Sequence, residues 1–299
     1  MTAQSHPRDR AFFDFSSRLK LRVSGADRLR FLNGQLTNDV RKTSETTAIE
    51  ACVLNAKGKT DGHLFLHAKE DCFLLDADLA LQSTLQTRLE RYIIADDVTI
   101  EDLSARLSIF HVIGDAVPKL SCSAHFISID RFGLGGHDVW IEAPKHDEIA
   151  AELSKEIEFC DEECAERFRI EQGIPRWGHE LTNDIIPVEA NLEARCIDYE
   201  KGCYIGQETI SRMKMSGQRS KQLCGLISMK NIPFVPGNRI VANDKDIGWI
   251  TSATRSAGRE IALGYVKRGF NSVGSRVQVV AAENAAIPAE IVDLPFEHR

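Results

Sequence analysis

The chain has 299 residues, of which 43% are hydrophobic and 27% are charged. These values are ordinary for a globular protein and exclude collagen-like, low-complexity and disordered chains, while the length predicts about two domains. The 37 basic and 44 acidic residues give a net charge of −7. Direct binding of nucleic acid through bulk positive charge is therefore not expected.

No uncharged apolar run reaches the ~18 residues that a membrane span requires, and the N-terminus has no apolar core of a secretory signal. We therefore predict a cytoplasmic protein without a membrane partner, whose eight cysteines are reduced thiols. Cys160 and Cys164 are four residues apart and would share one helix face. Because no second pair with a recognised spacing stands nearby, buried thiols are favoured over a metal site, and no metal is predicted.

The first 217 residues mix strand and helix patterns. Alternation of apolar and charged residues predicts a strand over 19–23, and the spacing of Leu29, Leu32 and Leu36 predicts a helix. Further strand patterns lie at 51–54, 63–67, 72–76, 107–112, 126–129 and 138–142, and further helix patterns at 81–89 and 149–157. Since the order shows no regular βαβ alternation, it predicts an α+β fold.

After residue 218 the helical periodicity disappears. Short strand patterns follow one another at 223–228, 239–242, 247–252, 261–266 and 276–281, with turn residues between them. This spacing predicts a small β-barrel or sandwich. We therefore divide the chain into a region of residues 1–217 and a C-terminal domain of residues 218–299.

The first segment that could carry chemistry is residues 167–181. Its helix must end near Gly173 because Pro175 cannot continue it. Glu171 then lies in the last turn, where the helix dipole disfavours a carboxylate. A ligand with adjacent N–H and NH₂ donors would give this carboxylate a purpose. The alternative is a solvated surface glutamate, which is the more frequent case for such a residue.

The second segment is Lys201-Gly202-Cys203-Tyr204-Ile205-Gly206-Gln207-Glu208. Cys203 precedes a predicted helix and follows Lys201, and both features stabilise a thiolate. It is the best candidate for a reactive cysteine, with a packed small residue as the equal alternative. Residues 209–222 contain four basic and no acidic side chains. That run would suit an anionic tail or RNA, although a solvated face is the more frequent outcome.

The octapeptide KGCYIGQE resembles the signature of the YgfZ-type folate-binding proteins. These are bacterial relatives of the mitochondrial iron–sulfur assembly factors, and they resemble the T-protein (aminomethyltransferase) of the glycine cleavage system. Further matches to the family patterns lie at 23–40, 171–176, 187–192, 248–252 and 263–266. The resemblance therefore covers most of the chain.

The resemblance implies a T-protein-like clover leaf of three domains around a central channel that holds tetrahydrofolate or a one-carbon derivative. Two intertwined α+β subdomains would lie within the folate-binding region 1–217, and a β-barrel would form residues 218–299. Glu171 falls on the glutamate that holds the pterin in the T-protein. Arg176, Lys201 and Tyr204 are the other residues that we expect to contact the folate.

One motif departs from the T-protein pattern. The T-protein turn reads GG-x-x-DD and contains a catalytic aspartate, whereas this chain has Lys57-Gly58-Lys59-Thr60-Asp61-Gly62. The glycine pair and the second carboxylate are missing, and Asp61 remains as a candidate base.

The resemblance leads to one main hypothesis and two alternatives. The main hypothesis is a monomeric folate-binding accessory protein that supports iron–sulfur cluster assembly or repair, with client or assembly proteins as partners. Effects on cluster enzymes, including those that modify tRNA, would be indirect, and Cys203 would carry the function. The alternatives are a folate-dependent aminomethyltransferase and an interaction module with a vestigial folate site.

Overall fold

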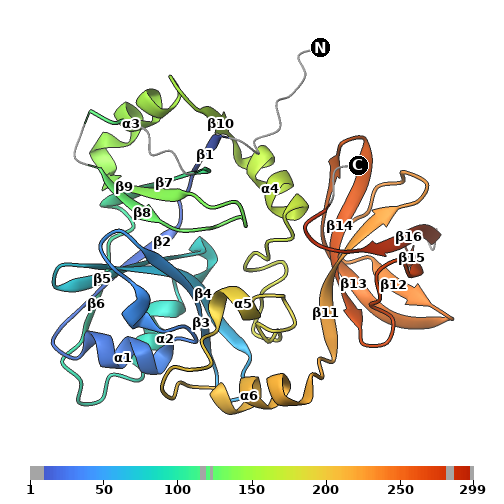
Figure 1. Ribbon diagram of the computed structural model, residues 1–299, viewed down its shortest axis with the longest axis horizontal. Helices are drawn as coiled ribbons and strands as arrows, with labels where there is room; N and C mark the ends of the chain where they lie inside the picture. Colours follow the sequence, from blue (N-terminus) through green and yellow to red (C-terminus); the bar gives the residue numbers. More distant parts are fainter. Residues whose placement is uncertain (1–9, 115–118, 122–123, 281–285, 297–299) are drawn as a thin grey trace. The chain divides into compact units, whose positions relative to one another are not determined.

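The computed structural model describes residues 10–114, 119–121, 124–280 and 286–296 (Figure 1). The chain divides into two compact units. Unit 1 comprises Met1–Ala56, Asp61–Ala165 and Arg195–Gln207, and unit 2 comprises Lys57–Thr60, Glu166–Ala194 and Glu208–Arg299. Each unit is thus built from segments that are far apart in the sequence.

Unit 1 contains a first five-stranded sheet in the order β3-β4-β5-β2-β6. Its strands are β2 (Leu19–Ser24), β3 (Ala48–Leu54), β4 (Thr60–Lys69), β5 (Cys72–Ala77) and β6 (Thr99–Asp102), and α1 (Arg28–Gln35) and α2 (Leu85–Glu90) lie between them in the chain. The strands predicted at 19–23, 51–54, 63–67 and 72–76 are confirmed. The first helix is confirmed as α1, but the predicted buried face of Leu29, Leu32 and Leu36 is partly wrong. Leu29 is exposed, and α1 buries Phe31 together with Leu32.

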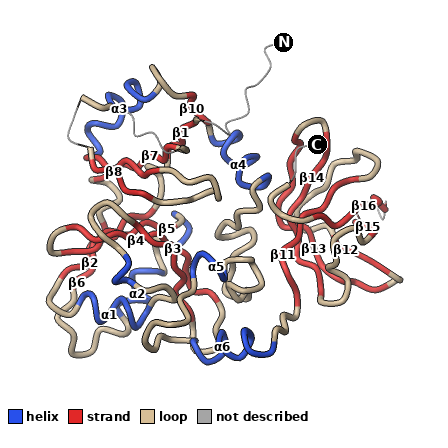
Figure 2. Tube along the Cα trace, in the orientation of Figure 1, coloured by secondary structure: helices blue, strands red, loops and turns tan. Residues whose placement is uncertain are grey.

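Unit 1 also contains a second five-stranded sheet in the order β10-β1-β7-β9-β8. Its members are β1 (Ala11–Asp14), β7 (Leu107–Val112), β8 (His125–Ser128), β9 (His137–Glu142) and β10 (Glu158–Cys160), with α3 (His146–Leu153) before β10. Phe12, Phe110 and Ile141 from three of these strands form one core with Ile149 and Leu153 of α3. Helix and strand are interspersed along this part of the chain (Figure 2), as the pattern predicted.

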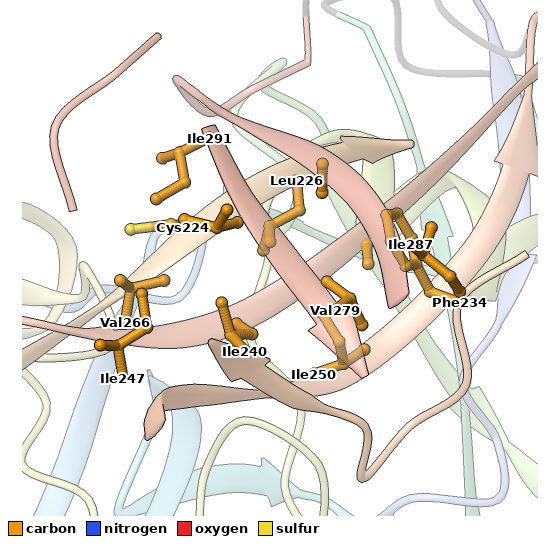
Figure 3. Close-up of a cluster of buried hydrophobic side chains, with 13 residues drawn as sticks. Cys224, Leu226, Phe234, Ile240, Ile247, Ile250, Val266, Val279, Ile287 and Ile291 are labelled. Carbon is orange, nitrogen blue, oxygen red and sulfur yellow. The ribbon is translucent and has the colours of Figure 1, made fainter. Parts of the chain in front are cut away.

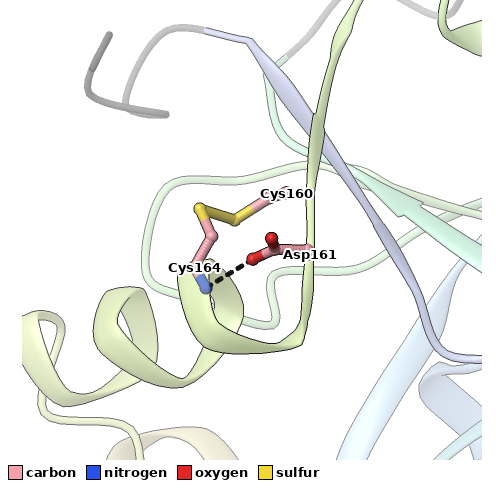
Figure 4. Close-up of a disulfide and its surroundings, with 3 residues drawn as sticks. All are labelled: Cys160, Asp161 and Cys164. Carbon is pink, nitrogen blue, oxygen red and sulfur yellow. Dashed lines mark hydrogen bonds between the residues drawn. A yellow bond between two sulfur atoms is a disulfide. The ribbon is translucent and has the colours of Figure 1, made fainter. Parts of the chain in front are cut away.

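A disulfide joins Cys160 at the end of β10 to Cys164 in α4 (Glu162–Glu171), with 5.3 Å between the two Cα atoms (Figure 4). The side chain of Asp161 accepts a hydrogen bond of 2.9 Å from the backbone N–H of Cys164 at the start of the same helix. The prediction that every cysteine is a reduced thiol is therefore wrong for this pair. The predicted shared helix face is also wrong, because Cys160 ends β10 and only Cys164 lies in α4, so the disulfide links the strand to the first turn of the helix.

The C-terminal part of unit 2 is a closed barrel in the order β11-β14-β13-β12-β15-β16. The strands are β11 (Lys221–Ser228), β12 (Arg239–Ala242), β13 (Lys245–Ser256), β14 (Arg259–Lys267), β15 (Arg276–Val280) and β16 (Ala286–Val292). Alternate apolar residues point inward, among them Leu226, Ile240, Ile250 and Ile287 (Figure 3). The sequence pattern predicted five of the six strands. It missed β16, where Pro288 interrupts the run although Ile287, Ala289 and Ile291 are buried.

No helix within the described ranges is both long and apolar enough to cross a membrane.

The close pairing of β13 and β14 depends on Gly248. A Cβ atom at this position would lie 1.9 Å from the carbonyl oxygen of Tyr265, so Gly248→Ala should force the two strands apart and lower the free energy of unfolding by at least about 2–3 kcal/mol. Gly34 in α1 is the matched control, because a Cβ there meets nothing within 4 Å and alanine should raise stability by about 0.5–1 kcal/mol. Denaturant unfolding measures both, and equal values for the two variants would contradict the packing argument.

Candidate functional site

The end of α4 places Glu171. Gly173 has φ = +69°, and the backbone N–H groups of Gly173 and Ile174 donate to the carbonyl oxygens of Ile170 (3.0 Å) and Arg169 (2.8 Å). This pair of bonds is the Schellman motif, which ends a helix at a left-handed residue. The predicted helix end at Gly173 is therefore confirmed, and Glu171 occupies the last helical turn.

The side chain of Glu171 is 2% exposed, so its interpretation as a solvated surface glutamate is wrong. The hydroxyl of Ser256, at the end of β13, donates a short hydrogen bond to its Oε1 atom. Burial and the negative end of the helix dipole both oppose a carboxylate at this position. A folate contact by Glu171 stays a prediction.

A buried ion network beside Glu171 fixes α4 against the barrel, and the sequence pattern did not predict it. The guanidinium of Arg169 donates to Glu180 (2.9 Å) and to the hydroxyl of Ser252 on β13 (2.7 Å). Glu180 in turn accepts from Ser252 at 2.6 Å, and its carbonyl accepts from the hydroxyl of Tyr265 at 2.9 Å. Nearby carboxylates hold the pKa of Arg169 above its usual value despite burial. The partners are 83 and 11 residues from Arg169, which is why no local motif revealed them.

Arg176 lies in the same unit as Glu171 and forms an ion pair of 3.0 Å with Glu166. Its backbone N–H donates to Glu180 at 3.1 Å, which joins it to the network of Arg169. The side chain is 37% exposed. A folate contact by Arg176 stays a prediction.

Lys201 is the most tightly held residue of the KGCYIGQE segment. Its ammonium donates to three backbone carbonyl oxygens, those of Asn33 (2.7 Å), Leu36 (2.6 Å) and Asn38 (2.9 Å). Burial lowers the pKa of Lys201 to about 8, while the three acceptors favour the charged form. An ammonium has three N–H groups, so these bonds engage all of them and fasten the segment to the chain that follows α1.

Tyr204 follows on the inner side of the same segment. Its ring lies 5.1 Å from the Lys201 ammonium, and the residue is 7% exposed. Its hydroxyl is buried and has no hydrogen-bond partner among the described residues. Buried hydroxyl groups are usually satisfied, so this atom is suited to a ligand. The contact between Tyr204 and a folate stays a prediction.

Cys203 lies between these two residues and points outward. Of the free cysteines in the described parts of the chain, it is the exposed one, while Cys52, Cys72, Cys196 and Cys224 are buried. The helix that was predicted after it is α6 (Gln207–Ser216), with Glu208 in the first turn. The segment therefore presents a thiol to solvent from a loop whose neighbours on both sides are held in place.

Asp61 stands at the start of β4 in unit 1. Its carboxylate accepts from Arg88 Nε at 2.9 Å and from Asn55 at 3.4 Å. Arg88 also donates to the carbonyl of Leu54 at 2.6 Å. Asp61 is thus part of a polar network at the start of β4, and its predicted role as a base stays a prediction.

The predicted site residues fall into two groups. Asp61, Lys201, Cys203 and Tyr204 belong to unit 1, whereas Glu171 and Arg176 belong to unit 2. Within unit 1, Lys201 and Tyr204 are in contact. Within unit 2, Glu171 and Arg176 flank the network of Arg169 and Glu180.

Comparisons with known proteins agree with this fold. The profile of the glycine cleavage T-protein C-terminal barrel domain matches residues 221–297. An aminomethyltransferase of Bacillus velezensis is 27% identical over 321 residues, which cover 96% of this chain and 86% of the relative. A chloroplastic protein of Arabidopsis thaliana that is named as a transferase is 26% identical over 95% of this chain and 71% of its own length.

The crystal structure of the glycine cleavage system aminomethyltransferase T from Bartonella henselae superposes with a TM-score of 0.84. It is 19% identical, and the match covers 98% of this chain and 88% of that chain. The predicted α+β class with a C-terminal β-barrel is therefore confirmed. The C-terminal barrel thus matches the profile of the glycine cleavage T-protein C-terminal barrel domain, and the whole chain is similar in sequence to proteins named aminomethyltransferase and has the fold of aminomethyltransferase T.

The bonds of Lys201 predict a structural cost for its replacement. Lys201→Met keeps the apolar stem but leaves three buried carbonyl groups without their donors, so the free energy of unfolding should fall by about 2–4 kcal/mol. Lys230→Met is the control, because Lys230 is exposed after β11 and its loss should change stability by less than about 0.5 kcal/mol. Chemical denaturation of both variants is the measurement. Indistinguishable midpoints would show that Lys201 does not hold the segment.

Proposed function

We propose that this aminomethyltransferase-like chain binds a reduced folate, either tetrahydrofolate or a one-carbon derivative, with the carboxylate of Glu171 accepting hydrogen bonds from the pterin ring. The observation that carries the proposal is the burial of this carboxylate at the C-terminal end of α4. Its position is opposed by desolvation and by the helix dipole. A planar ligand with adjacent N–H donors would pair with such a group through charge-assisted bonds.

Two further points support a folate. The relatives named aminomethyltransferase are similar over nearly the whole chain, and enzymes of that type use tetrahydrofolate. Within unit 1, the buried hydroxyl of Tyr204 has no hydrogen-bond partner among the described residues, and a polar ligand would satisfy it.

Within this class, we propose the accessory role of the YgfZ-type proteins, which is support of iron–sulfur cluster assembly or repair. The support comes from the KGCYIGQE segment, which resembles the signature of that branch. Its thiol at Cys203 is exposed, and the flanking Lys201 and Tyr204 are anchored. An accessible thiol on an anchored loop is suited to contact a client protein, a cluster or a one-carbon adduct.

The alternative is one-carbon transfer of the glycine cleavage type, in which Asp61 acts as the base. The names of the relatives and the fold favour this alternative. The departure of the Asp61 turn from the T-protein pattern favours the accessory role, because residues 57–62 lack the glycine pair and the second carboxylate.

The folate proposal predicts a specific loss of affinity. Glu171→Gln keeps the size of the side chain but removes the charge, so the affinity for tetrahydrofolate should fall ten- to a hundredfold, or about 1.5–3 kcal/mol. Glu163→Gln, at an exposed position in the first turn of the same helix, should bind as the parent does. Anaerobic calorimetry with tetrahydrofolate measures all three proteins. Equal affinity of Glu171→Gln and the parent would remove the pterin assignment.

The two uses of the folate are separated by a pair of variants. In the accessory role, Cys203→Ala should bind folate normally but fail to restore cluster-enzyme activity in a deletion strain, whereas Asp61→Ala should restore most of it. In the transferase role, Asp61→Ala should lower the transfer rate by at least the ~10²-fold that a general base contributes. Both variants are assayed for both activities. Transfer by the parent that collapses in Asp61→Ala would decide for the alternative.

A further inference from the structure

Three buried side chains with metal-binding atoms, those of Glu50, His63 and Cys196, meet inside unit 1, and the thiol of Cys52 lies beside them. Glu50 and Cys52 are two residues apart on β3, so their side chains leave the same face of the sheet. His63 lies on the neighbouring strand β4, and Cys196 ends α5 (Glu193–Cys196). Figure 1 shows α5 beside these two strands.

The geometry of these side chains is compact. One ligand atom each from Glu50, His63 and Cys196 lies within 4.8 Å of the other two, and all three residues are buried. Burial, and after it the neighbouring side chain of Cys52, raise the pKa of the Cys196 thiol. Both cysteines are fully buried, with 0% exposure. One sulfur atom, one imidazole nitrogen and one carboxylate oxygen thus lie close to a common point, and the thiol of Cys52 lies beside this cluster.

Hydrogen bonds from neighbouring residues orient these side chains, as they do around the ligands of known metal sites. Arg195 Nε donates to Glu50 Oε2 at 2.6 Å, while Oε1 faces His63 Nε2 at 2.7 Å. The hydroxyl of Thr37 donates to the carbonyl of Cys196 at 2.5 Å and accepts from the N–H of Cys52 at 2.9 Å. One carboxylate oxygen is therefore held by a cation and the other is turned inward, and the two cysteine backbones are tied together. Such supporting bonds are typical of metal ligands.

We propose that Glu50, Cys52, His63 and Cys196 bind a structural zinc ion. Two thiolates, an imidazole and a carboxylate form a four-ligand set that zinc accepts in tetrahedral geometry, and thiolate donors discriminate against magnesium and calcium. The two thiolates and the carboxylate carry three negative charges, which the zinc ion and the guanidinium of Arg195 balance. Binding releases the proton of each thiol, and any proton between His63 and Glu50, to solvent.

The ion would have a defined structural effect. Cys196 precedes Lys201 by five residues, so the metal would fix the start of the chain that leads into the KGCYIGQE segment. Because all four side chains are buried, the ion would enter while the unit folds. This inference does not depend on the folate proposal.

The direct test is the metal content of the parent chain, purified without chelator under reducing conditions. Mass spectrometry of the metals should find about one zinc ion per chain. The reduced chain, unfolded and refolded with Co²⁺ alone, should show the visible bands of tetrahedral cobalt and a thiolate-to-cobalt charge-transfer band in the near ultraviolet.

Variants assign the ligands. Cys196→Ser and Cys52→Ser should each weaken the charge-transfer band and lose most of the zinc, and His63→Gln should lose zinc without removing a thiolate. Cys72→Ser and Cys224→Ser are the controls, since these cysteines are also buried and free but lie outside the cluster, and they should bind as the parent does.

Two outcomes would overturn the inference. The first is a folded parent chain that contains no zinc and takes up no Co²⁺ on refolding, which would leave the cluster as a hydrogen-bonded network. The second is bound metal with unchanged content and spectrum in all three cluster variants, Cys196→Ser, Cys52→Ser and His63→Gln. The measurements on the parent chain remain decisive if a variant fails to fold.

Discussion

A single buried guanidinium joins the two sheets on which unit 1 is built. Arg131 donates to Asp76 on β5 at 2.7 Å and to Asp138 on β9 at 2.5 Å, and its side chain is 3% exposed. The two carboxylates raise its pKa above the usual value, and Arg131 with His111 holds the pKa of Asp138 well below its ordinary range. A buried charge of this kind is tolerated only when its partners are complete, and removal of one partner typically costs 3–5 kcal/mol.

Asp130, the residue before Arg131, links this junction of the sheets to the candidate zinc ligands. The carbonyl of Asp130, next to Arg131, accepts from Arg195 at 2.5 Å, and Arg195 holds Glu50. Hydrogen bonds thus lead from the backbone of Asp130, next to the junction of the sheets, through Arg195 to Glu50 on β3. In unit 2, Arg169 and Glu180 perform the corresponding task by fixing α4 to β13, with Glu171 two residues beyond Arg169. In each unit, a buried arginine (Arg131 in unit 1 and Arg169 in unit 2) thus fixes a stretch of backbone close to a candidate functional group.

The sequence predicts features that depend on local residue patterns, and it does not predict features that depend on contacts between distant residues. Alternation of apolar and polar residues over 223–228, 247–252 and 261–266 predicts strands, because each barrel strand has one inward face. The succession of short strand patterns without helical periodicity after residue 218 predicts the barrel itself. The end of α4 follows from Gly173 and Pro175. The role of Lys201 could not be predicted, because its acceptors are up to 168 residues away. The cluster of Glu50, His63 and Cys196 has no motif spacing, since α5 and the two strands meet only in the fold.

Some errors have equally physical causes. The absence of an export signal predicts reduced thiols at Cys160 and Cys164, but their i, i+4 placement across the start of α4 brings the sulfur atoms within bonding distance. The strand β16 was missed because Pro288 lowers strand propensity. Its side chain lies between the buried Ile287 and Ala289 on the outer face of the barrel, where the fold accepts it. The pattern of residues alone does not predict a binding role for Glu171, because burial at a helix end is not visible in a sequence. The expectation that Glu171 contacts a folate comes from the family resemblance.

Asp61 and Cys203, the two candidates for a reacting group, differ in how their side chains are held. Asp61 is tied to Arg88, and Arg88 is itself tied to the backbone of Leu54, so the side chain belongs to the hydrogen-bond network at the start of β4. Cys203 is exposed on a loop that Lys201 anchors, so its sulfur can be reached from solvent. Such access to a reaction partner is what the role proposed for Cys203 requires.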